Sequence, residues 1–365
     1  MSLLFWFASS IILIQLSYWV FFYFSLTKKI NLGPAKDVPV SVIVCAHDEE
    51  QNLRELIPLL LSQNHAAFEI IIVDDRSNDG TYDLLLTETK NHPTLKMIHI
   101  NLKPNHVNGK KYALTLGIKA ARYDWVLLTD ADCRPNSGEW IGQMANAFIE
   151  KTSIVLGYSP YRAEPGLLNA FIRFETMLTA IQYFSFAMSG FPYMGVGRNL
   201  AYRKNLFLDN KGFNGHISVT GGDDDLFVNQ HANSQNVSLV VNEKATVFSK
   251  AKTNWKEFFQ QKLRHLSVGK YYTVKTKLIL APFSISMIFF WPIAFASLFS
   301  SLWYWALAAM LLRWMFQLIV AFRFSAMSHE KFNPFLIPLV DIIFWFYYLV
   351  TGLSALATKR IKWKT

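Results

Sequence analysis

The stretch Trp125-Val126-Leu127-Leu128-Thr129-Asp130-Ala131-Asp132 decides the fold class of this chain. Five residues typical of a buried strand come first, and two carboxylates follow on a tight turn. In an open parallel sheet such turns lie at the carboxyl ends of the strands, where ligands bind. Both carboxylates can reach one hard divalent cation there, and an acidic turn that faces solvent is the alternative. The stretch therefore predicts a strand that ends at a ligand site.

Three further runs upstream share this strand-like character, and segments with apolar residues at three- and four-residue spacing lie between them. The runs are Val40–Ala46, Phe68–Val73 and Lys96–Ile100, and the helical segments are Asn52–Ser62, Thr81–Lys90 and Lys110–Ala121. Alternating strands and helices are typical of a mainly parallel sheet that is covered by helices. We therefore expect an α/β fold with a Rossmann-like, nucleotide-binding sheet.

A second acidic pair, Asp74 and Asp75, ends a run of isoleucine and valine. A carboxylate at this position can accept hydrogen bonds from a nucleobase or a ribose. Capping of the helix that begins near Thr81 is the alternative, but Ser77 or Asp79 suits that role better. We therefore expect Asp74 and Asp75 to bind a nucleotide and to have no structural role.

Three adjacent carboxylates, Asp223, Asp224 and Asp225, form the third acidic set. They repel one another unless solvent, a cation or a helix N-terminus offsets their charge. A member with a raised pKa would suit a general base, and another member can belong to the first turn of a helix that continues to His231. Both interpretations can hold for different members of the set.

Gln261 and Arg264 lie three residues apart in a helical segment and therefore share one face. Arg264 can neutralise a diphosphate through paired hydrogen bonds. Contact with lipid headgroups is the alternative, because the segment directly precedes a long apolar stretch.

The composition predicts contact with a membrane. Hydrophobic residues make up 52% of the chain and charged residues 17%, against about 25% charged residues in a soluble protein. Leu3 to Leu26 contains no charged residue and is long enough to cross about 30 Å of hydrocarbon. A signal peptide is the alternative, but no basic residue precedes the run and no clear cleavage site follows it. Residues 278–324 hold two further spans' worth of apolar sequence, and residues 335–357 offer a third.

These observations predict a membrane helix at 1–27, a catalytic domain at 28–277, a membrane region at 278–358 and a basic tail at 359–365. Interfacial helices are expected at about 166–189 and 255–272, although core packing is the alternative for the first. Lys28 and Lys29 beside the first span place the central domain in the cytoplasm, at the cell (inner) membrane. Three C-terminal crossings would put the basic tail outside, and Pro338 and Asp341 make the last segment a candidate for a re-entrant one. Two or three crossings therefore stay open.

The net charge of +10 fits anionic lipid headgroups or a polyphosphate ligand. We expect no nucleic-acid partner, because no dense basic run with interleaved aromatic residues occurs in the central domain. Cys45 and Cys133 lie in or just after strand-like runs, so buried free thiols are favoured over a disulfide.

Seven stretches, in this order along the chain, resemble the motifs of glycosyltransferase family 2, which includes cellulose, chitin and hyaluronan synthases and ceramide glucosyltransferase. They are VSVIVCAHDEE, IIIVDDRSNDGT, GKKYAL, LLTDADC, GVGRNLAYRK, GGDDDLF and QKLRH, and they extend from Val40 to about Tyr272. The resemblance implies a GT-A fold, a nucleotide-sugar donor and Mg²⁺ or Mn²⁺ as cofactor.

The resemblance also implies roles for individual residues. Asp75, with Asp74 beside it, matches the uridine-contacting aspartate, and Lys110 matches the lysine beside the diphosphate. Asp130 and Asp132 match the metal motif. Asp223 lies three residues before Leu226, as the family's general base does, and Asp224 is the alternative because Gly222 replaces a residue that is often acidic. The remaining assignments are Gln261 and Arg264 on the donor side and Arg198, Asn199 and His265 on the acceptor side.

The implied activity is an inverting transfer of a sugar, expected to be UDP-linked, to a lipid or lipid-linked saccharide at the cytoplasmic membrane face. A processive polysaccharide synthase is the alternative, but His265 replaces the tryptophan that lies against the acceptor sugar in processive members. The non-enzymatic alternative is a membrane scaffold that binds nucleotide sugars without turnover. A transporter is disfavoured, because transporters place polar residues within their spans, whereas the acidic sets of this chain lie in the central domain.

Overall fold

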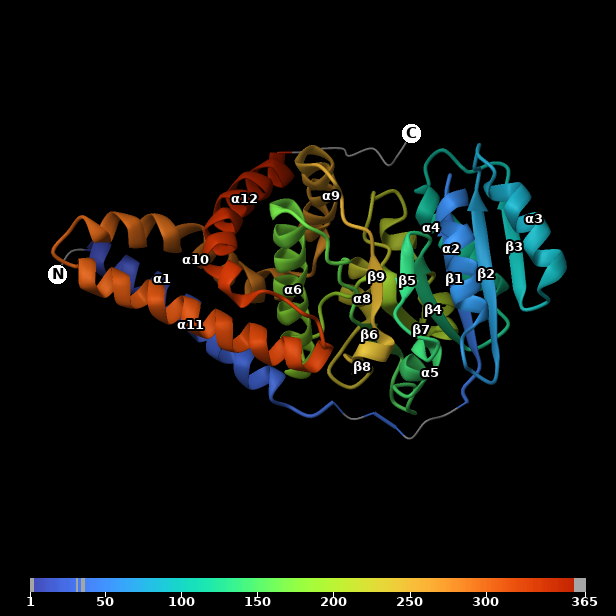
Figure 1. The fold of residues 1–365 in the computed structure, drawn as a ribbon, viewed down its shortest axis with the longest axis horizontal. Coiled ribbons are helices and arrows are strands. Elements are labelled where there is room, and N and C mark those ends of the chain that lie inside the picture. Colours follow the sequence, from blue (N-terminus) through green and yellow to red (C-terminus); the bar gives the residue numbers. More distant parts are fainter. Residues whose placement is uncertain (1–2, 31, 34–36, 358–365) are drawn as a thin grey trace. The chain divides into compact units, whose positions relative to one another are not determined.

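The computed structural model describes residues 3–30, 32–33 and 37–357 and divides into two compact units (Figure 1). The sheet unit comprises Ile30–Arg162 and Gly190–Ala251. The helical unit comprises Met1–Lys29, Ala163–Ser189 and Lys252–Thr365. The predicted basic tail at 359–365 lies outside the described residues.

A seven-stranded sheet with the order β3-β2-β1-β4-β7-β6-β8 forms the centre of the sheet unit. Strands β1 to β4 pair in parallel, β7 runs antiparallel to both β4 and β6, and β6 pairs with β8 in parallel. The predicted, mainly parallel α/β sheet is therefore confirmed. The strands are β1 (Val40–Ala46), β2 (Phe68–Asp75), β3 (Leu95–Ile100), β4 (Trp125–Asp130), β6 (Ile154–Gly157), β7 (Leu200–Arg203) and β8 (Val237–Val240), and a separate pair joins β5 (Cys133–Pro135) to β9 (Val247–Ser249).

The helices of the sheet unit bury their apolar stripes against the strands. Gly117 shows how closely helix α4 approaches, because a Cβ atom there would lie 2.8 Å from the Ile43 side chain. The central strands β1 and β2 are almost wholly buried, so their side chains form the core of the unit. The helices are α2 (Glu50–Leu61), α3 (Thr81–Asn91), α4 (Gly109–Ala120), α5 (Trp140–Ala145), α7 (Lys204–Asp209) and α8 (Asp225–His231).

The helical unit contains six helices among the residues described. Four of these, α1, α10, α11 and α12, are long and apolar enough to cross a membrane. The helices are α1 (Leu3–Leu26), α6 (Leu167–Met188), α9 (Trp255–Val268), α10 (Val274–Leu298), α11 (Trp303–Ser328) and α12 (Ile337–Ala357).

Pro338 and Asp341, which made the last apolar segment a candidate re-entrant one, are both accommodated in helix α12. Pro338 is the second residue of the helix, where a missing backbone N–H costs little. Asp341 is fully buried and pairs with Arg313 of α11 through two hydrogen bonds of 2.8 and 3.0 Å. The acidic residue is therefore neutralised inside the helical unit, and α12 continues past it.

Helices α6 and α9 also belong to the helical unit. Glu175 of α6 accepts a hydrogen bond from Lys262 of α9, and Phe171 packs against Phe258 at 5.9 Å between ring centroids. More than half of the side chains of α6 are buried, and its place at the membrane interface stays a prediction. Helix α9, which carries the predicted donor-binding residues Gln261 and Arg264, is thereby fixed to α6.

Candidate active site

The predicted metal motif lies at the carboxyl end of β4. Asp130 is the last residue of that strand and pairs in register with Cys45 of β1. Asp130, Asp132 and Cys133 offer ligand atoms that lie within 4.8 Å of one another. Burial and the neighbouring Asp130 raise the pKa of Asp132, so a cation here would relieve the repulsion between the carboxylates. The two aspartates fit Mg²⁺ or Mn²⁺, whereas the buried Cys133 thiol is too soft a ligand for these ions.

Lys110 links the metal motif to the acidic set at 223–225. Its ammonium group lies 2.9 Å from Asp130 Oδ1 and 3.1 Å from Asp223 Oδ2. Burial opposes the charge on Lys110, but Asp130 and Asp223 raise its pKa overall. Burial likewise opposes the charge on Asp223, but Lys110 lowers the pKa of Asp223 overall, so this carboxylate stays ionised. The structure thus brings three predicted site residues together from separate segments of the chain.

Asp223 and Asp224 have different surroundings. The two oxygens of Asp224 accept hydrogen bonds from the backbone N–H groups of Gly197, at 2.7 Å, and Asp225, at 2.8 Å. Burial and the adjacent Asp223 raise the pKa of Asp224. Asp224 caps helix α8, the structural role that the sequence had left open for one member of the set. The raised pKa that was expected of a base from the sequence thus belongs to the capping residue Asp224, whereas Asp223 is ionised, contacts the side chain of Lys110 and stays the candidate base from the resemblance.

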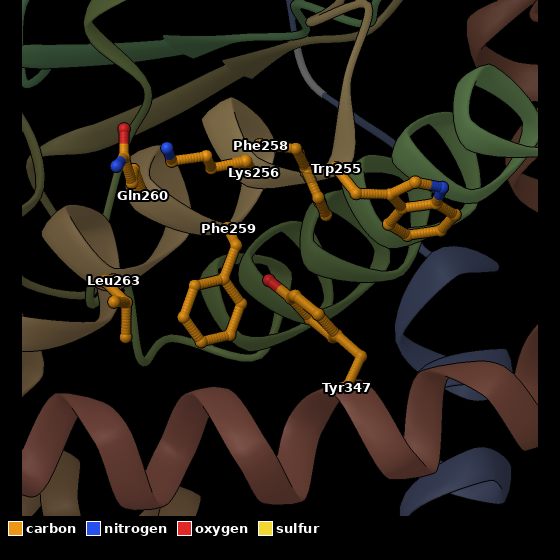
Figure 2. Close-up of a pocket in the computed structure, with 7 residues that line it drawn as sticks. All are labelled: Trp255, Lys256, Phe258, Phe259, Gln260, Leu263 and Tyr347. Carbon is orange, nitrogen blue, oxygen red and sulfur yellow. The ribbon is translucent and has the colours of Figure 1, made fainter.

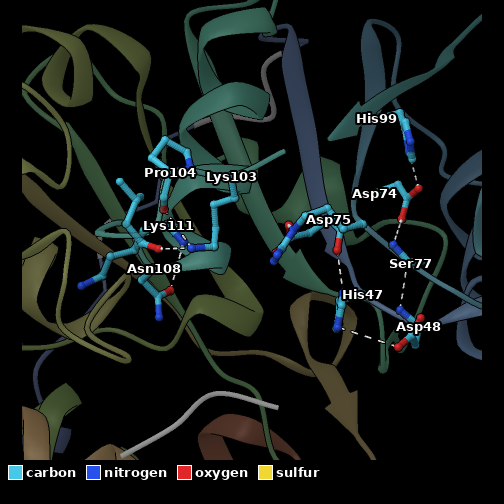
Figure 3. Close-up of polar contacts among 12 residues, drawn as sticks. His47, Asp48, Asp74, Asp75, Ser77, His99, Lys103, Pro104, Asn108 and Lys111 are labelled. Atoms are coloured by element: carbon cyan, nitrogen blue, oxygen red, sulfur yellow. Dashed lines mark hydrogen bonds and ion pairs between the residues drawn. The ribbon is translucent and has the colours of Figure 1, made fainter. Parts of the chain in front are cut away.

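Asp74 makes structural hydrogen bonds that were not expected from the sequence, and its part in nucleotide binding stays a prediction (Figure 3). It is fully buried, its Oδ2 lies 2.7 Å from Nδ1 of His99, and its Oδ1 accepts the Ser77 N–H at 3.2 Å. Of the two capping candidates, Ser77 and Asp79, it is Asp79 that accepts the N–H of Thr81, the first residue of α3, at 3.0 Å, although Gly80 holds the N-cap position itself. The parallel pairing of β2 with β3 supplies the His99 partner, which the local sequence does not reveal.

Asp75 lies at the end of β2 next to the first turn of α4. Its Oδ1 accepts a hydrogen bond of 2.8 Å from Arg76, and Nδ1 of His47 lies 2.6 Å from its backbone oxygen. A Cβ atom on Gly109 would lie only 2.6 Å from Asp75 Oδ2. Glycine therefore allows the helix to start beside this carboxylate, and Asp75 is the stronger candidate of the acidic pair for a nucleoside contact.

Two family models match the chain. The model of glycosyl transferase family 2 matches residues 41–204, and the model of glycosyl transferase family group 2 matches residues 125–350. The chain is a family 2 glycosyltransferase.

Curated relatives share short regions with this glycosyltransferase. Poly-beta-1,6-N-acetyl-D-glucosamine synthase of Staphylococcus aureus (strain COL) is 30% identical over 125 residues, which cover 32% of this chain and 29% of that protein. The probable glycosyltransferase YdaM of Bacillus subtilis (strain 168) is 31% identical over 153 residues, or 39% of this chain and 35% of that protein. The glycosyltransferase thus spans about a third of the length of the curated relatives it matches.

The fold is shared with a solved structure, the mannosyltransferase PcManGT from Pyrobaculum calidifontis in complex with GDP-Man and Mn²⁺. The TM-score is 0.61, the sequence identity is 14%, and the similarity covers 95% of this chain and 96% of that one. The likeness confirms the GT-A fold of the glycosyltransferase.

Arg198, which the sequence assigns to the acceptor side, is held by the sheet unit of the glycosyltransferase. Its guanidinium group lies 4.4 Å from the ring centroid of Tyr161, and its Nη2 donates to the backbone oxygen of Ser159 at 2.9 Å. Its Nη1 is buried and has no hydrogen-bond partner within the described part of the chain. The charge also acts on Asp132, whose pKa it lowers against the dominant effects of burial and Asp130. Arg198 is therefore positioned to bind an anionic group near the metal motif.

Asn199, which the resemblance assigns to the acceptor side, makes several hydrogen bonds within the sheet unit. Its side chain is fully buried, and its oxygen accepts the indole N–H of Trp140 at 3.0 Å. Its amide nitrogen donates to the backbone oxygens of Tyr158 and Ala245, both at 2.8 Å. The amide joins three segments of the sheet unit, and the assignment of Asn199 to the acceptor side stays a prediction from the resemblance.

Gln261, Arg264 and His265 lie on α9 of the helical unit, whereas the other predicted site residues belong to the sheet unit. Their assignments to the donor and acceptor stay predictions from the resemblance. Gln261 and Arg264 lie within one turn of each other on this helix, as their spacing indicates.

Lys111 is a site-positioning residue that the sequence did not single out. It is fully buried, and its ammonium group donates to the backbone oxygens of His216, at 2.6 Å, and Val219, at 3.0 Å. Burial lowers its pKa to about 8. Lys111 thus fixes the loop that leads to the acidic set, while its neighbour Lys110 faces the carboxylates. The doubled lysine of the GKKYAL stretch was the available signal, but it does not show which lysine is buried.

Proposed function

We propose that this glycosyltransferase moves a sugar from a nucleoside diphosphate sugar, expected to be UDP-linked, to a lipid or a lipid-linked saccharide, with inversion at the anomeric carbon. The observation that carries the proposal is the contact of one lysine with both a metal-motif carboxylate and the candidate base. Such a site can bind a charged leaving group and accept a proton within a few ångströms. We place the reaction at the cytoplasmic face of the cell membrane.

The proposed reaction is a single displacement. Asp223 accepts the proton of the acceptor hydroxyl while that oxygen bonds to the anomeric carbon of the donor sugar. The bond from the anomeric carbon to the diphosphate oxygen breaks on the opposite side, so the nucleoside diphosphate leaves and the configuration inverts. Lys110 donates hydrogen bonds to the leaving diphosphate, and Asp75 binds the nucleoside. No covalent intermediate with the protein is needed.

Asp132 and Asp130 would hold the divalent cation. When bound there, Mg²⁺ or Mn²⁺ supplies positive charge that stabilises the departing diphosphate. The Mn²⁺ and GDP-Man described for the mannosyltransferase PcManGT support a metal and a nucleotide sugar for this fold. Arg198 lies near the same carboxylates, and we assign it to an anionic group of the acceptor.

A groove in the helical unit supports a lipid acceptor (Figure 2). Its volume is about 550 Å³, and most of its lining is aromatic or aliphatic. Tyr347 belongs to α12, one of the helices able to cross a membrane, so the groove opens between an amphipathic helix and a candidate membrane span. We assign it to the hydrocarbon chain of the acceptor. The lining residues are Trp255, Lys256, Phe258, Phe259, Gln260, Leu263 and Tyr347.

A processive polysaccharide synthase is the second candidate function. The region shared with poly-beta-1,6-N-acetyl-D-glucosamine synthase favours it, whereas His265 in place of the family's tryptophan favours a single transfer.

Incubation of membranes with labelled nucleotide sugars tests the proposal. We expect one label to enter the lipid extract with the wild-type protein and no label to enter with Asp223→Asn. Label in long insoluble polymer would establish the processive alternative. If the protein binds the donor but transfers no sugar to any of a panel of acceptors, it acts as a nucleotide-sugar-binding scaffold and not as the proposed enzyme.

A further inference from the structure

The ammonium group of Lys110 lies between two carboxylates that have separate tasks in the proposed reaction. Asp130 belongs to the metal motif, and Asp223 is the candidate base. The contacts, at 2.9 and 3.1 Å, are charge-assisted hydrogen bonds in a largely buried setting, where such bonds are strong. The lysine therefore engages both carboxylates at once.

A divalent cation and this ammonium group compete for Asp130. Two cations that share one carboxylate repel each other, and burial strengthens the repulsion because solvent screens it less. Lys110 also donates to Asp223, so one oxygen of the base is already occupied by a hydrogen bond. While Lys110 keeps both contacts, the site is thus poorly suited to bind a metal or to accept a proton.

We propose that Lys110 is a positioning residue that makes metal binding and release of the base depend on the arrival of a nucleoside diphosphate. The inference rests on the proposed function. A diphosphate offers Lys110 at least as much negative charge as the two carboxylates, on several adjacent oxygens, and lysine binds phosphate well as a compact point charge. When the ammonium group moves to the phosphate oxygens, Asp130 becomes available to the cation and Asp223 to the acceptor hydroxyl. The step exchanges hydrogen bonds only, and no covalent bond changes.

The local structure allows this movement to be confined to one side chain. Asn108 caps α4 by accepting the Lys111 N–H, which fixes the backbone at the start of the helix. The neighbouring Lys111 is held by the backbone oxygens of His216 and Val219. Lys111 therefore cannot replace Lys110, whose flexible stem is free to carry its charge from the carboxylates to a phosphate.

A titration with Mn²⁺ alone tests the proposal, with free Mn²⁺ measured by electron paramagnetic resonance. The full chain in detergent is compared as wild type, Lys110→Met and Lys119→Met; Lys119 is an exposed lysine of the same helix, and its substitution removes the same charge. We expect Lys110→Met to bind Mn²⁺ about tenfold more tightly than wild type without nucleotide. Added UDP or GDP should tighten Mn²⁺ binding in wild type and in Lys119→Met, and much less in Lys110→Met. Lys110→Arg, which keeps a cation, should bind Mn²⁺ alone as weakly as wild type.

Equal or weaker binding of Mn²⁺ by Lys110→Met would overturn the proposal, because a purely structural lysine would not improve metal affinity when removed. Lys110→Gln serves the same purpose if the methionine variant does not fold. Asp132→Asn separates this outcome from failure of the proposed function. If Asp132→Asn binds Mn²⁺ like wild type, the metal motif itself is wrong. If Asp132→Asn loses Mn²⁺ while Lys110→Met matches wild type, only the role of Lys110 is rejected.

Discussion

Asp132 and Asp223 have different neighbours, so their substitution by asparagine should affect different steps of the reaction. Asp132→Asn removes a charged ligand of the cation, so metal-dependent binding of the donor should be lost. Asp223→Asn removes the proton acceptor but leaves the donor contacts, so turnover should fall by about 10²- to 10⁴-fold while donor affinity stays nearly unchanged. Calorimetric donor titration and a transfer assay measure the two effects. Normal turnover in Asp223→Asn would contradict the assignment of the base.

Gly109 permits the close approach of α4 to Asp75, which leads to a second prediction at the level of single residues. In Gly109→Ala the new Cβ would displace the Asp75 carboxylate, since the ideal separation is only 2.6 Å. We expect donor affinity to fall about tenfold, equivalent to about 1.4 kcal/mol, with little change in thermal stability. Gly215→Ala is the matched control, because a Cβ there meets no atom within 4 Å. Equal donor affinities of Gly109→Ala and Gly215→Ala would contradict the assignment of Asp75 to the donor site.

Helix α9 carries a departure from the family motif at His265, where the family has tryptophan. A tryptophan offers a larger face for stacking against a sugar than histidine does. We expect His265→Trp to lengthen the product if the acceptor sugar lies against this position, as the resemblance implies. Electrophoresis or mass spectrometry of labelled products compares the variant with wild type. If the variant is expressed normally and its products keep the wild-type length, residue 265 does not determine product length.

The fixed position of α9 also matters at the scale of elements, because its ion pair with α6 is buried. Lys262 and Glu175 are each largely covered, so loss of either partner would leave a charge without compensation. The sequence places Lys262 beside Gln261 and Arg264, as part of one basic cluster. The structure shows that Lys262 instead pairs with Glu175 of α6, so it does not act together with Gln261 and Arg264.

At the scale of the whole molecule, the apolar helices are joined by a buried polar network. Arg313 of α11 pairs with Asp341 of α12 and also donates to Gln15 of α1. Gln317 donates to Asp341 at 2.7 Å, and Gln15 donates to Ser286 of α10 at 2.7 Å. All four helices that are able to cross a membrane contribute, so the network defines how they pack together.

Asp341→Ala should therefore destabilise the protein strongly, by about 3–5 kcal/mol, because Arg313 would be left as an unpaired buried charge. The double variant Arg313→Met/Asp341→Leu should recover much of this loss, because it removes both charges and retains volume. Thermal unfolding in detergent, followed by the fraction of protein that stays soluble, compares the two. A single variant as stable as wild type would show that the ion pair contributes little.

The sequence by itself determined the elements and the kind of site. Short apolar runs set the strands β1 to β4 within two residues of their observed ends, and their alternation with helices predicted a parallel sheet with the carboxylates of β2 and β4 at one edge. Hydrophobic periodicity and strand-end position are local properties, so the sequence is sufficient for them. Only the tertiary structure decided which member of each polar pair has a structural role: Asp74 rather than Asp75, Lys111 rather than Lys110, Asp224 rather than Asp223. The partners that decide these roles, among them His99, His216 and Gly197, lie far away in the sequence. Hydrogen bonds between residues so far apart along the chain form only once the chain has folded.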